Sequence, residues 1–122
     1  MREILFRGKR IDNDKWVEGS LILLKKRFGT GYYINPISTI CASFGVIPET
    51  VEQFTGLTDK NGVKIFEGDQ FELPILSTLE EFKHTEILTV VFKNAAFCLE
   101  NERRSMLLSN VQIYEFEILP LK

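Results

Sequence analysis

The sequence predicts a single small domain with a mainly β fold, and three observations support this prediction. The chain has 122 residues, of which 44% are hydrophobic and 26% charged, as in an ordinary globular protein with a single core. Runs of β-branched and aromatic residues recur at short intervals between turn residues. A 17-residue stretch from Gln53 to Asp69 holds three glycines where the backbone must bend. Strands in this number imply a small sheet that curls or closes into a barrel, with little helix.

Residues 1–48 predict an N-terminal hairpin region. A strand from Glu3 to Lys9 is followed by the polar break Asp12 to Asp14 and a second strand from Lys15 to Leu24. A third run, Tyr32 to Ile34, ends at Pro36, because proline cannot donate to a central strand ladder. Residues 36–46 carry no clear pattern.

Residues 49–122 predict the barrel core. Asn61 and Gly62 form a strong hairpin signal before a strand from Val63 to Phe66. Ser77 followed by Glu80 fits a capping box over residues 78–83, but so short a helix is marginal, so residues 74–84 are predicted as an exposed hairpin tip. Further strands are predicted at residues 70–76, 86–93, 96–100 and 111–119.

Composition argues against a membrane protein and against a disulfide. The longest aliphatic run, Leu21 to Leu24, is far shorter than the ~20 residues of a membrane-spanning helix. Charges in residues 1–7 interrupt the apolar residues too early for a secretory signal, so we expect a cytoplasmic protein. Cys41 and Cys98 are isolated in apolar surroundings, which favours buried thiols.

Charge is distributed unevenly along the chain. Residues 1–27 hold eight Lys/Arg and four Asp/Glu, whereas residues 28–122 hold seven and thirteen. Such a split permits a basic patch that faces a polyanion, an acidic partner or a second copy of the chain.

The stretch from Gln53 to Asp69 resembles the signature of the YopX family of phage and prophage proteins. In that signature Gln-aromatic-Thr-Gly-Leu leads into Asp-Lys-Asn-Gly and then Glu-Gly-Asp. Phe6–Lys9 and Lys15–Gly19 resemble the family's opening arginine strand and its Trp-Val pair. Ser109–Glu115 resembles its Gly-Asn-Ile-Tyr-Glu ending, with serine where glycine is usual. The resemblance implies one domain over residues 1–122, a barrel related to SH3-like folds and a phage-encoded protein in a bacterial host cell. It supplies no catalytic residue.

The turn motif within this stretch is predicted to be structural. Gly62 supplies the positive φ of a tight turn, and the carboxylates of Asp59 and Asp69 can bond turn amides. The residues assigned to this motif are Gly56, Asp59, Asn61, Gly62, Glu67, Gly68 and Asp69.

An enzymatic interpretation is weaker. Asp59, Glu67 and Asp69 would supply the acid, base or metal ligands of a carboxylate-dependent hydrolase. A calcium loop does not fit, because Gly62 is the fourth residue from Asp59 and not the sixth. His84 is the only histidine and lies among charged neighbours, which favours a solvated side chain over a catalytic one. We therefore predict no enzyme, cofactor or metal.

The predicted function is a non-enzymatic interaction module that self-associates, because the sequence offers many β edges and no credible active site. A phage or host protein is a further candidate partner. The alternative is a nucleic-acid-binding barrel, against which the pI of about 5.5 counts. Its cations would be Arg7, Lys9, Arg10, Lys25, Lys26 and Arg27, with Tyr32 and Tyr33 as stacking faces.

Overall fold

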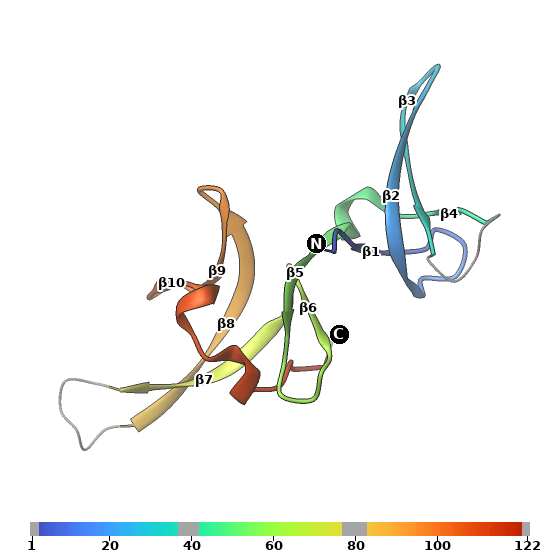
Figure 1. Cartoon of the computed structure of the whole chain (residues 1–122). Helices are drawn as coiled ribbons and strands as arrows, with labels where there is room; N and C mark the ends of the chain where they lie inside the picture. The colour runs from blue at the N-terminus through green and yellow to red at the C-terminus, as the bar shows by residue number, and fades with distance from the viewer. Residues whose placement is uncertain (1–2, 37–41, 77–82, 121–122) are drawn as a thin grey trace. The chain divides into compact units, whose positions relative to one another are not determined.

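The computed structural model describes residues 3–36, 42–76 and 83–120, and its regular structure there is β-strand with three short 3₁₀ turns (Figure 1). Ten strands form two antiparallel sheets in this part of the chain, with no α-helix. The mainly β class is therefore confirmed. Among the described residues neither sheet closes into a barrel, because the first ends at β4 and β6 and the second at β7 and β10. The barrel predicted for residues 49–122 is wrong in this respect, and the SH3-like architecture is not confirmed.

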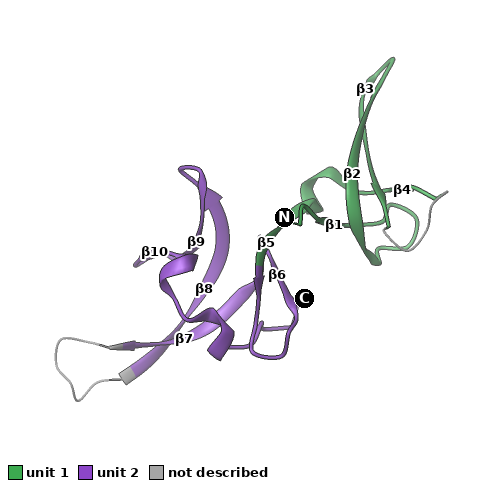
Figure 2. Cartoon of the chain, viewed as in Figure 1, with its two compact units in different colours: residues 1–56 green, residues 57–122 purple. Residues whose placement is uncertain are grey.

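The chain divides into two compact units, residues 1–56 and residues 57–122 (Figure 2). The boundary falls within β5 (Glu52–Thr58), at Gly56, which has a φ of +89°. A single domain over residues 1–122, with a hairpin region that ends at residue 48, stays a prediction. Each unit is described by itself below.

Unit 1 contains most of the first sheet. The sheet has the order β4-β3-β2-β1-β5-β6, of which β6 and the end of β5 belong to unit 2. β1 pairs antiparallel with both β2 and β5, and β2 pairs with β3 over seven residue pairs. The elements before β5 are β1 (Phe6–Lys9), β2 (Trp16–Lys26), β3 (Gly29–Asn35), β4 (Phe44–Gly45) and the 3₁₀ turn η1 (Pro48–Thr50).

A small core and one threonine hold the base of unit 1. The buried apolar side chains are those of Leu5, Ile34, Val46 and Phe54. Thr50 Oγ1 accepts the Lys9 N–H at 2.8 Å and donates to the Ile47 carbonyl at 2.6 Å, which ties η1 to β1. Gly19 is required where β2 leaves this base, because a Cβ there would lie 2.0 Å from the Asn35 carbonyl oxygen.

Unit 2 contains the second sheet, with the order β10-β9-β8-β7. Alternating residues of β7 (Phe71, Leu73 and Ile75) and of β8 (Leu88 and Val90) face the core, as expected for strands with one covered face. The elements are β6 (Lys64–Phe66), β7 (Gln70–Leu76), β8 (Lys83–Lys93), β9 (Ala96–Glu100), β10 (Ser105–Leu107) and the 3₁₀ turns η2 (Leu108–Asn110) and η3 (Ile113–Glu115).

The predicted strand at residues 111–119 is wrong. This segment contains η3 and then an irregular stretch whose Phe116 and Ile118 side chains pack against the core of unit 2. Its backbone groups bond to turns and side chains: the Phe116 carbonyl accepts the Lys60 N–H, and the Ile118 N–H donates to Asp59. The alternating apolar residues thus belong to a segment that covers the core without joining a ladder.

Two further predictions fall partly outside the described residues. Lys83 begins β8, whereas the rest of the predicted helical turn, residues 78–82, lies outside them. Cys98 is a buried free thiol, and Cys41 lies outside the described residues.

The turn between β8 and β9 provides a test of backbone strain. Lys93 pairs with Ala96 across a two-residue turn in which Asn94 has a φ of +51° and Ala95 a φ of +62°. Alanine is strained in this left-handed region, and glycine is not.

We therefore expect Ala95→Gly to raise the free energy of unfolding by up to about 1 kcal/mol, measured by urea denaturation. Ala96→Gly is the matched control, because Ala96 lies in β9 without a positive φ and glycine there should be destabilising by about 0.5–1 kcal/mol. A loss of stability in both variants would contradict a left-handed Ala95.

Candidate functional site

The structure divides the six predicted cations into two groups, both in unit 1. Arg7, Lys9 and Arg10 lie in or next to β1, whose Lys9 pairs with Trp16 at the start of β2. The other three, Lys25, Lys26 and Arg27, lie at the far end of the β2–β3 hairpin. Ten residue steps along β2 separate the two groups, which corresponds to about 30 Å. They do not form one patch.

Arg7 and Lys9 are engaged within unit 1. Arg7 is buried, and its Nε donates to Glu52 Oε1 at 2.9 Å. Its guanidinium also lies 5.0 Å from the centre of the Trp16 ring, and the Lys9 ammonium lies 5.6 Å from the same ring. These contacts stabilise the base of the sheet.

Arg10 is also paired. Its guanidinium donates to both carboxylate oxygens of Asp12, at 2.9 and 2.6 Å, and lies 3.9 Å from the centre of the Phe44 ring. The hydrogen bond from Arg10 is the main cause of a lowered pKa at Asp12. The first group therefore offers little free charge to a ligand.

The second group projects into solvent. Lys25, Lys26 and Arg27 are exposed, and Phe28 beside them is 90% exposed. Two of these cations contact aromatic rings: the Lys26 ammonium lies 5.2 Å from the Tyr33 ring and the Arg27 guanidinium 5.8 Å from the Phe28 ring. The sequence contains no Asp or Glu between Glu18 and Glu49. This gap distinguishes the second group of cations from the first, but the sequence-based prediction grouped all six cations together and did not use it.

Beyond residue 19, β2 and β3 form a ribbon with apolar side chains in the middle of each face, and the short β4 pairs with β3 only at Tyr33 and Ile34. Leu23 lies opposite Tyr32 on one face, and Tyr33 lies opposite Ile22 on the other. Leu24 shares the second face and, like Leu23, is about half exposed. Because side chains alternate along a strand, Lys25 continues the first face toward the tip and Lys26 the second.

One edge of this ribbon is open. β1 pairs with β2 only from Trp16 to Gly19, and no strand of the described residues pairs with the outer edge of Ser20–Lys26 (Figure 1). The Tyr32 carbonyl accepts the Val46 N–H at 2.9 Å and so points away from β2. In an antiparallel ladder its partner Leu23 then points its own N–H and C=O away from β3. By alternation Leu21 and Lys25 do the same.

The turn motif of unit 2 is organised by Asp59. This buried carboxylate accepts the N–H groups of Asn61 at 2.8 Å and Val63 at 2.9 Å through one oxygen, and that of Ile118 at 3.1 Å through the other. Burial alone would raise the pKa of Asp59, but the three backbone hydrogen bonds lower it below the usual 3.8. Gly62 completes the turn with a φ of +76°.

Asp69 holds the next turn in the same way. It is 1% exposed, and its Oδ2 accepts the Phe66 N–H at 2.8 Å. Gly68 has a φ of +86°, and Glu67 beside it is partly buried. The two aspartates thus bind backbone amides, and no group of three metal-ligating side chains comes together within residues 3–36, 42–76 and 83–120.

We expect Asp59→Ala to lower the free energy of unfolding by about 2–4 kcal/mol, because three amides lose a charged acceptor. Urea denaturation at pH 7 measures the loss. Glu115→Ala, which removes an exposed carboxylate from η3, is the control and should change stability by less than about 0.5 kcal/mol. Equal stability of the two variants would show that Asp59 does not organise the turn.

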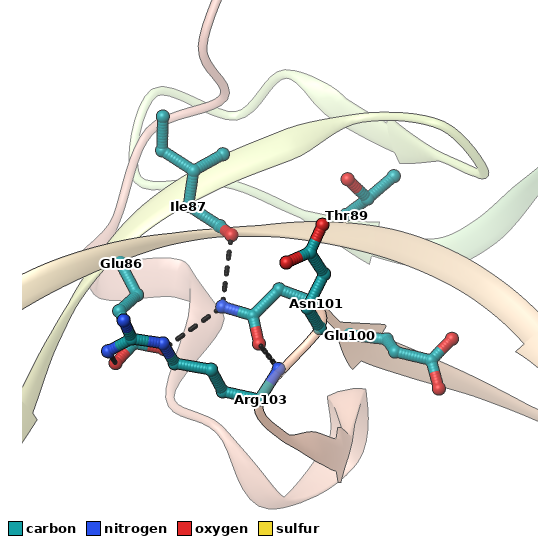
Figure 3. A pocket seen from close by; sticks show the side chains of 7 residues that line it. Glu86, Ile87, Thr89, Glu100, Asn101 and Arg103 are labelled. Atoms are coloured by element: carbon teal, nitrogen blue, oxygen red, sulfur yellow. Dashed lines mark hydrogen bonds and ion pairs between the residues drawn. The ribbon is translucent and has the colours of Figure 1, made fainter.

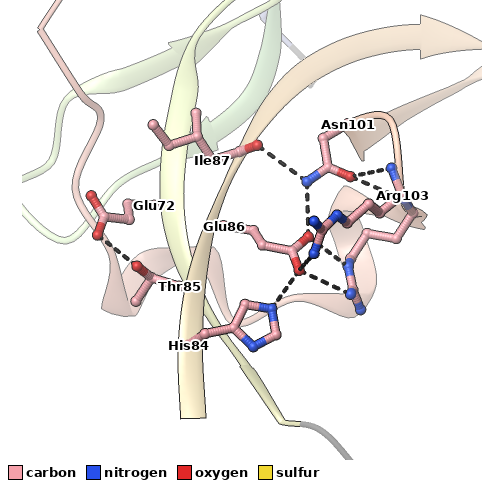
Figure 4. Close-up of polar contacts among 8 residues, drawn as sticks. Glu72, His84, Thr85, Glu86, Ile87, Asn101 and Arg103 are labelled. Carbon is pink, nitrogen blue, oxygen red and sulfur yellow. Dashed lines mark hydrogen bonds and ion pairs between the residues drawn. The ribbon is translucent and has the colours of Figure 1, made fainter. Parts of the chain in front are cut away.

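A polar cluster around Glu86 on β8 was not predicted. The Glu86 side chain is 9% exposed and accepts Asn101 Nδ2 at 3.0 Å and Arg104 Nε and Nη2 at 3.0 and 3.1 Å. His84 Nε2, on an exposed side chain, lies 2.6 Å from the same carboxylate (Figure 4). Hydrogen bonds from Asn101, His84 and Arg104 lower the pKa of Glu86 from 4.5 to about 2.

This cluster fastens the turn between β9 and β10. Asn101 Oδ1 accepts the N–H groups of Arg103 and Arg104 at 2.9 and 3.0 Å, while its amide group binds Glu86. An asparagine that caps its own turn is a readable signal, but nothing local marks Glu86, fifteen residues earlier.

An open pocket of about 320 Å³ borders the same turn (Figure 3). Its walls combine three carboxylates with one guanidinium, one amide and one threonine hydroxyl. The lining residues are Glu86, Ile87, Thr89, Glu100, Asn101, Glu102 and Arg103. This composition points to no particular ligand.

The lowered pKa of Glu86 makes a pH-dependent prediction. A carboxylate with a depressed folded-state pKa stabilises the fold above its ordinary value of 4.5, and this contribution is lost as the pH falls toward about 2. Glu86→Gln should therefore be less stable than the wild type at pH 7, and the difference should shrink at pH values near 2.

Denaturant unfolding at several pH values tests this prediction. Glu72→Gln, which replaces an exposed carboxylate on the neighbouring strand β7, is the control and should change stability at pH 7 by less than about 0.5 kcal/mol. A difference between Glu86→Gln and the wild type that stays constant from pH 7 to pH 2 would contradict the assigned role.

Fold and site together define a small all-β protein with two open sheets, structural carboxylates in its turns and an exposed cationic hairpin. A family model described as YopX protein matches residues 5–119, nearly the whole chain. The chain belongs to the YopX family. No curated protein and no solved structure matches it. In the described part of the chain no helix has the length and apolar character needed to span a membrane.

Proposed function

We propose that the protein is a non-enzymatic interaction module that self-associates, and that two copies meet along the open edge of β2. The observation that carries this proposal is the unpaired stretch Ser20–Lys26, whose backbone groups face away from β3 at every second residue. The family resemblance supports a site of action in the cytoplasm of a bacterial cell that carries the phage.

This edge has few of the features that usually prevent strand pairing. Natural edge strands are kept apart by short length, proline, bulges or charged residues along them. The open edge of β2 has seven residues, no proline and four consecutive aliphatic side chains, Leu21 to Leu24. Its charges stand only at the last two positions, Lys25 and Lys26. Such an edge is a template for a second strand.

A two-fold axis at Leu23 gives a register that suits the side chains. In an antiparallel pair centred there, Leu23 lies opposite Leu23 of the second copy, and Ile22 lies opposite Leu24. Lys25 then lies opposite Leu21, so that no like charges meet. The residues that point outward, Leu21, Leu23 and Lys25, are the ones that would hydrogen-bond across the axis. The contact is isologous, since both copies use the same edge, and it therefore produces a dimer and not a longer assembly.

The area involved is small, so we expect a weak dimer, with a dissociation constant of about 10–500 µM. Light scattering or sedimentation over about 5–500 µM should show the mass rise from the monomer's 14.1 kDa toward twice that value. A chain that stays monomeric throughout this concentration range would contradict the proposal of self-association.

Leu23→Lys tests the edge itself, because it brings two ammonium groups together at the axis, and we expect it to keep the protein monomeric. Ile87→Lys is the matched control, since Ile87 is equally exposed but lies on β8 of unit 2. It should dimerise like the wild type. Circular dichroism checks that both variants keep the β fold.

The charges of the two units favour a second arrangement. Residues 1–56 hold eight Lys/Arg and six Asp/Glu, a net +2, whereas residues 57–122 hold seven and eleven, a net −4. Unit 1 of one copy would then attract unit 2 of another. That contact weakens steeply as salt rises, whereas edge pairing does not, so the salt dependence of the mass distinguishes the two.

A further inference from the structure

We propose that the tip of the β2–β3 ribbon, residues 25–28, binds single-stranded nucleic acid. The tip shares Lys25 and Lys26 with the open edge of β2, but edge pairing would use the backbone, whereas the tip would bind through its side chains, so the proposal does not depend on dimerisation. It rests on uncompensated positive charge, on an exposed aromatic ring and on the position of both at a hairpin end.

The tip carries positive charge that unit 1 does not neutralise. Arg7 and Arg10, at the base, each have a carboxylate partner, Glu52 and Asp12. Lys25, Lys26 and Arg27 are exposed, and the sequence has no acidic residue from position 19 to position 48. Clustered cations without acidic neighbours attract a phosphate backbone and release its condensed counterions. The tip therefore has a charge suited to a polyanion in spite of the chain's net charge of −2.

Phe28 adds a preference for unpaired bases. Its ring stands 90% exposed at the turn, with the Arg27 guanidinium 5.8 Å from the ring centre. A ring in this position can stack on a base while the adjacent guanidinium binds the neighbouring phosphate. Bases in a duplex are already stacked on one another, so an exposed ring gains most from a single strand. The Tyr33 ring, 5.2 Å from the Lys26 ammonium, repeats the combination on one face of the ribbon.

The direct test is fluorescence anisotropy of a labelled oligothymidine of about 20 nucleotides, titrated with the full chain at low salt. We expect a micromolar dissociation constant. We assume that the three cations neutralise three phosphates. The logarithm of the association constant should then fall linearly with the logarithm of the salt concentration, with a slope of about −2. This slope corresponds to a roughly twentyfold loss of affinity between 50 and 200 mM salt.

Charge variants identify the site. The triple variant K25Q/K26Q/R27Q should lose binding. The matched control K15Q/K60Q/R103Q removes the same number of exposed cations outside the tip and should bind within about twofold of the wild type.

Variants of Phe28 test the aromatic ring. Phe28→Ala should weaken binding by about fivefold or more, whereas Phe28→Trp, which keeps an aromatic ring, should bind like the wild type. All four substituted positions of the tip are solvent-exposed, so the fold should persist, as circular dichroism can verify.

Four results would overturn the proposal. They are a flat signal at low salt, an equal loss in the two triple variants, tighter binding of a duplex of the same length, and stronger binding to polyglutamate or to anionic phosphatidylserine vesicles than to the oligonucleotide. The last two would assign the tip to a duplex, an acidic protein or a membrane surface.

Discussion

The exposed surface of unit 1 follows from a mismatch in strand length. β2 has eleven residues, whereas β1, which pairs with one of its edges, has four, and β4, which pairs with β3, has two. The core therefore supports only the first part of β2, and the remainder continues with β3 as a ribbon. A two-stranded ribbon is marginal on its own. The pairs Leu23–Tyr32 and Ile22–Tyr33 must stabilise it across the strands, which leaves apolar side chains in contact with water.

Unit 2 shows how the same chain protects other edges. β10 is only three residues long, and β7 carries Pro74, exposed, on the edge of its sheet. The Gln70 carbonyl on β7 accepts the Leu119 N–H from the covering segment at 2.9 Å. Short length, proline and a covering segment are the usual protections of an edge. Because unit 2 has them, the open edge of β2 stands out as the less protected edge of the chain's described part.

Local patterns predicted the strands whose contacts are local. β7 has the predicted bounds, because its apolar side chains alternate, and the Asn61–Gly62 turn was readable from two residues. Residues 111–119 alternate too, but an extended segment that covers a core has the same period as a strand. The two differ in where the backbone hydrogen bonds go, and Asp59 and Gln70 are far away in the sequence.

Long-range pairing also explains what the sequence could not say about the candidate site. Nearness along the chain grouped Arg7 and Arg10 with the cations of the ribbon, because the partner of Arg7, Glu52, is 45 residues distant. Glu86 was missed for the same reason. The gap in acidic residues between Glu18 and Glu49 needed no structure to be seen, and it separates the two groups of cations correctly.

The bond between Asp59 and Ile118 has a consequence for synthesis. The two residues are 59 positions apart, so a ribosome that adds about 5–20 residues per second makes the second roughly 3–12 seconds after the first. Throughout that interval the carboxylate is present without its third amide, and the covering segment has not yet emerged. Unit 1 has long-range partners of its own, such as Arg7 and Glu52, but all of its residues have been made by position 56, so it can reach its native pairing before Ile118 is added.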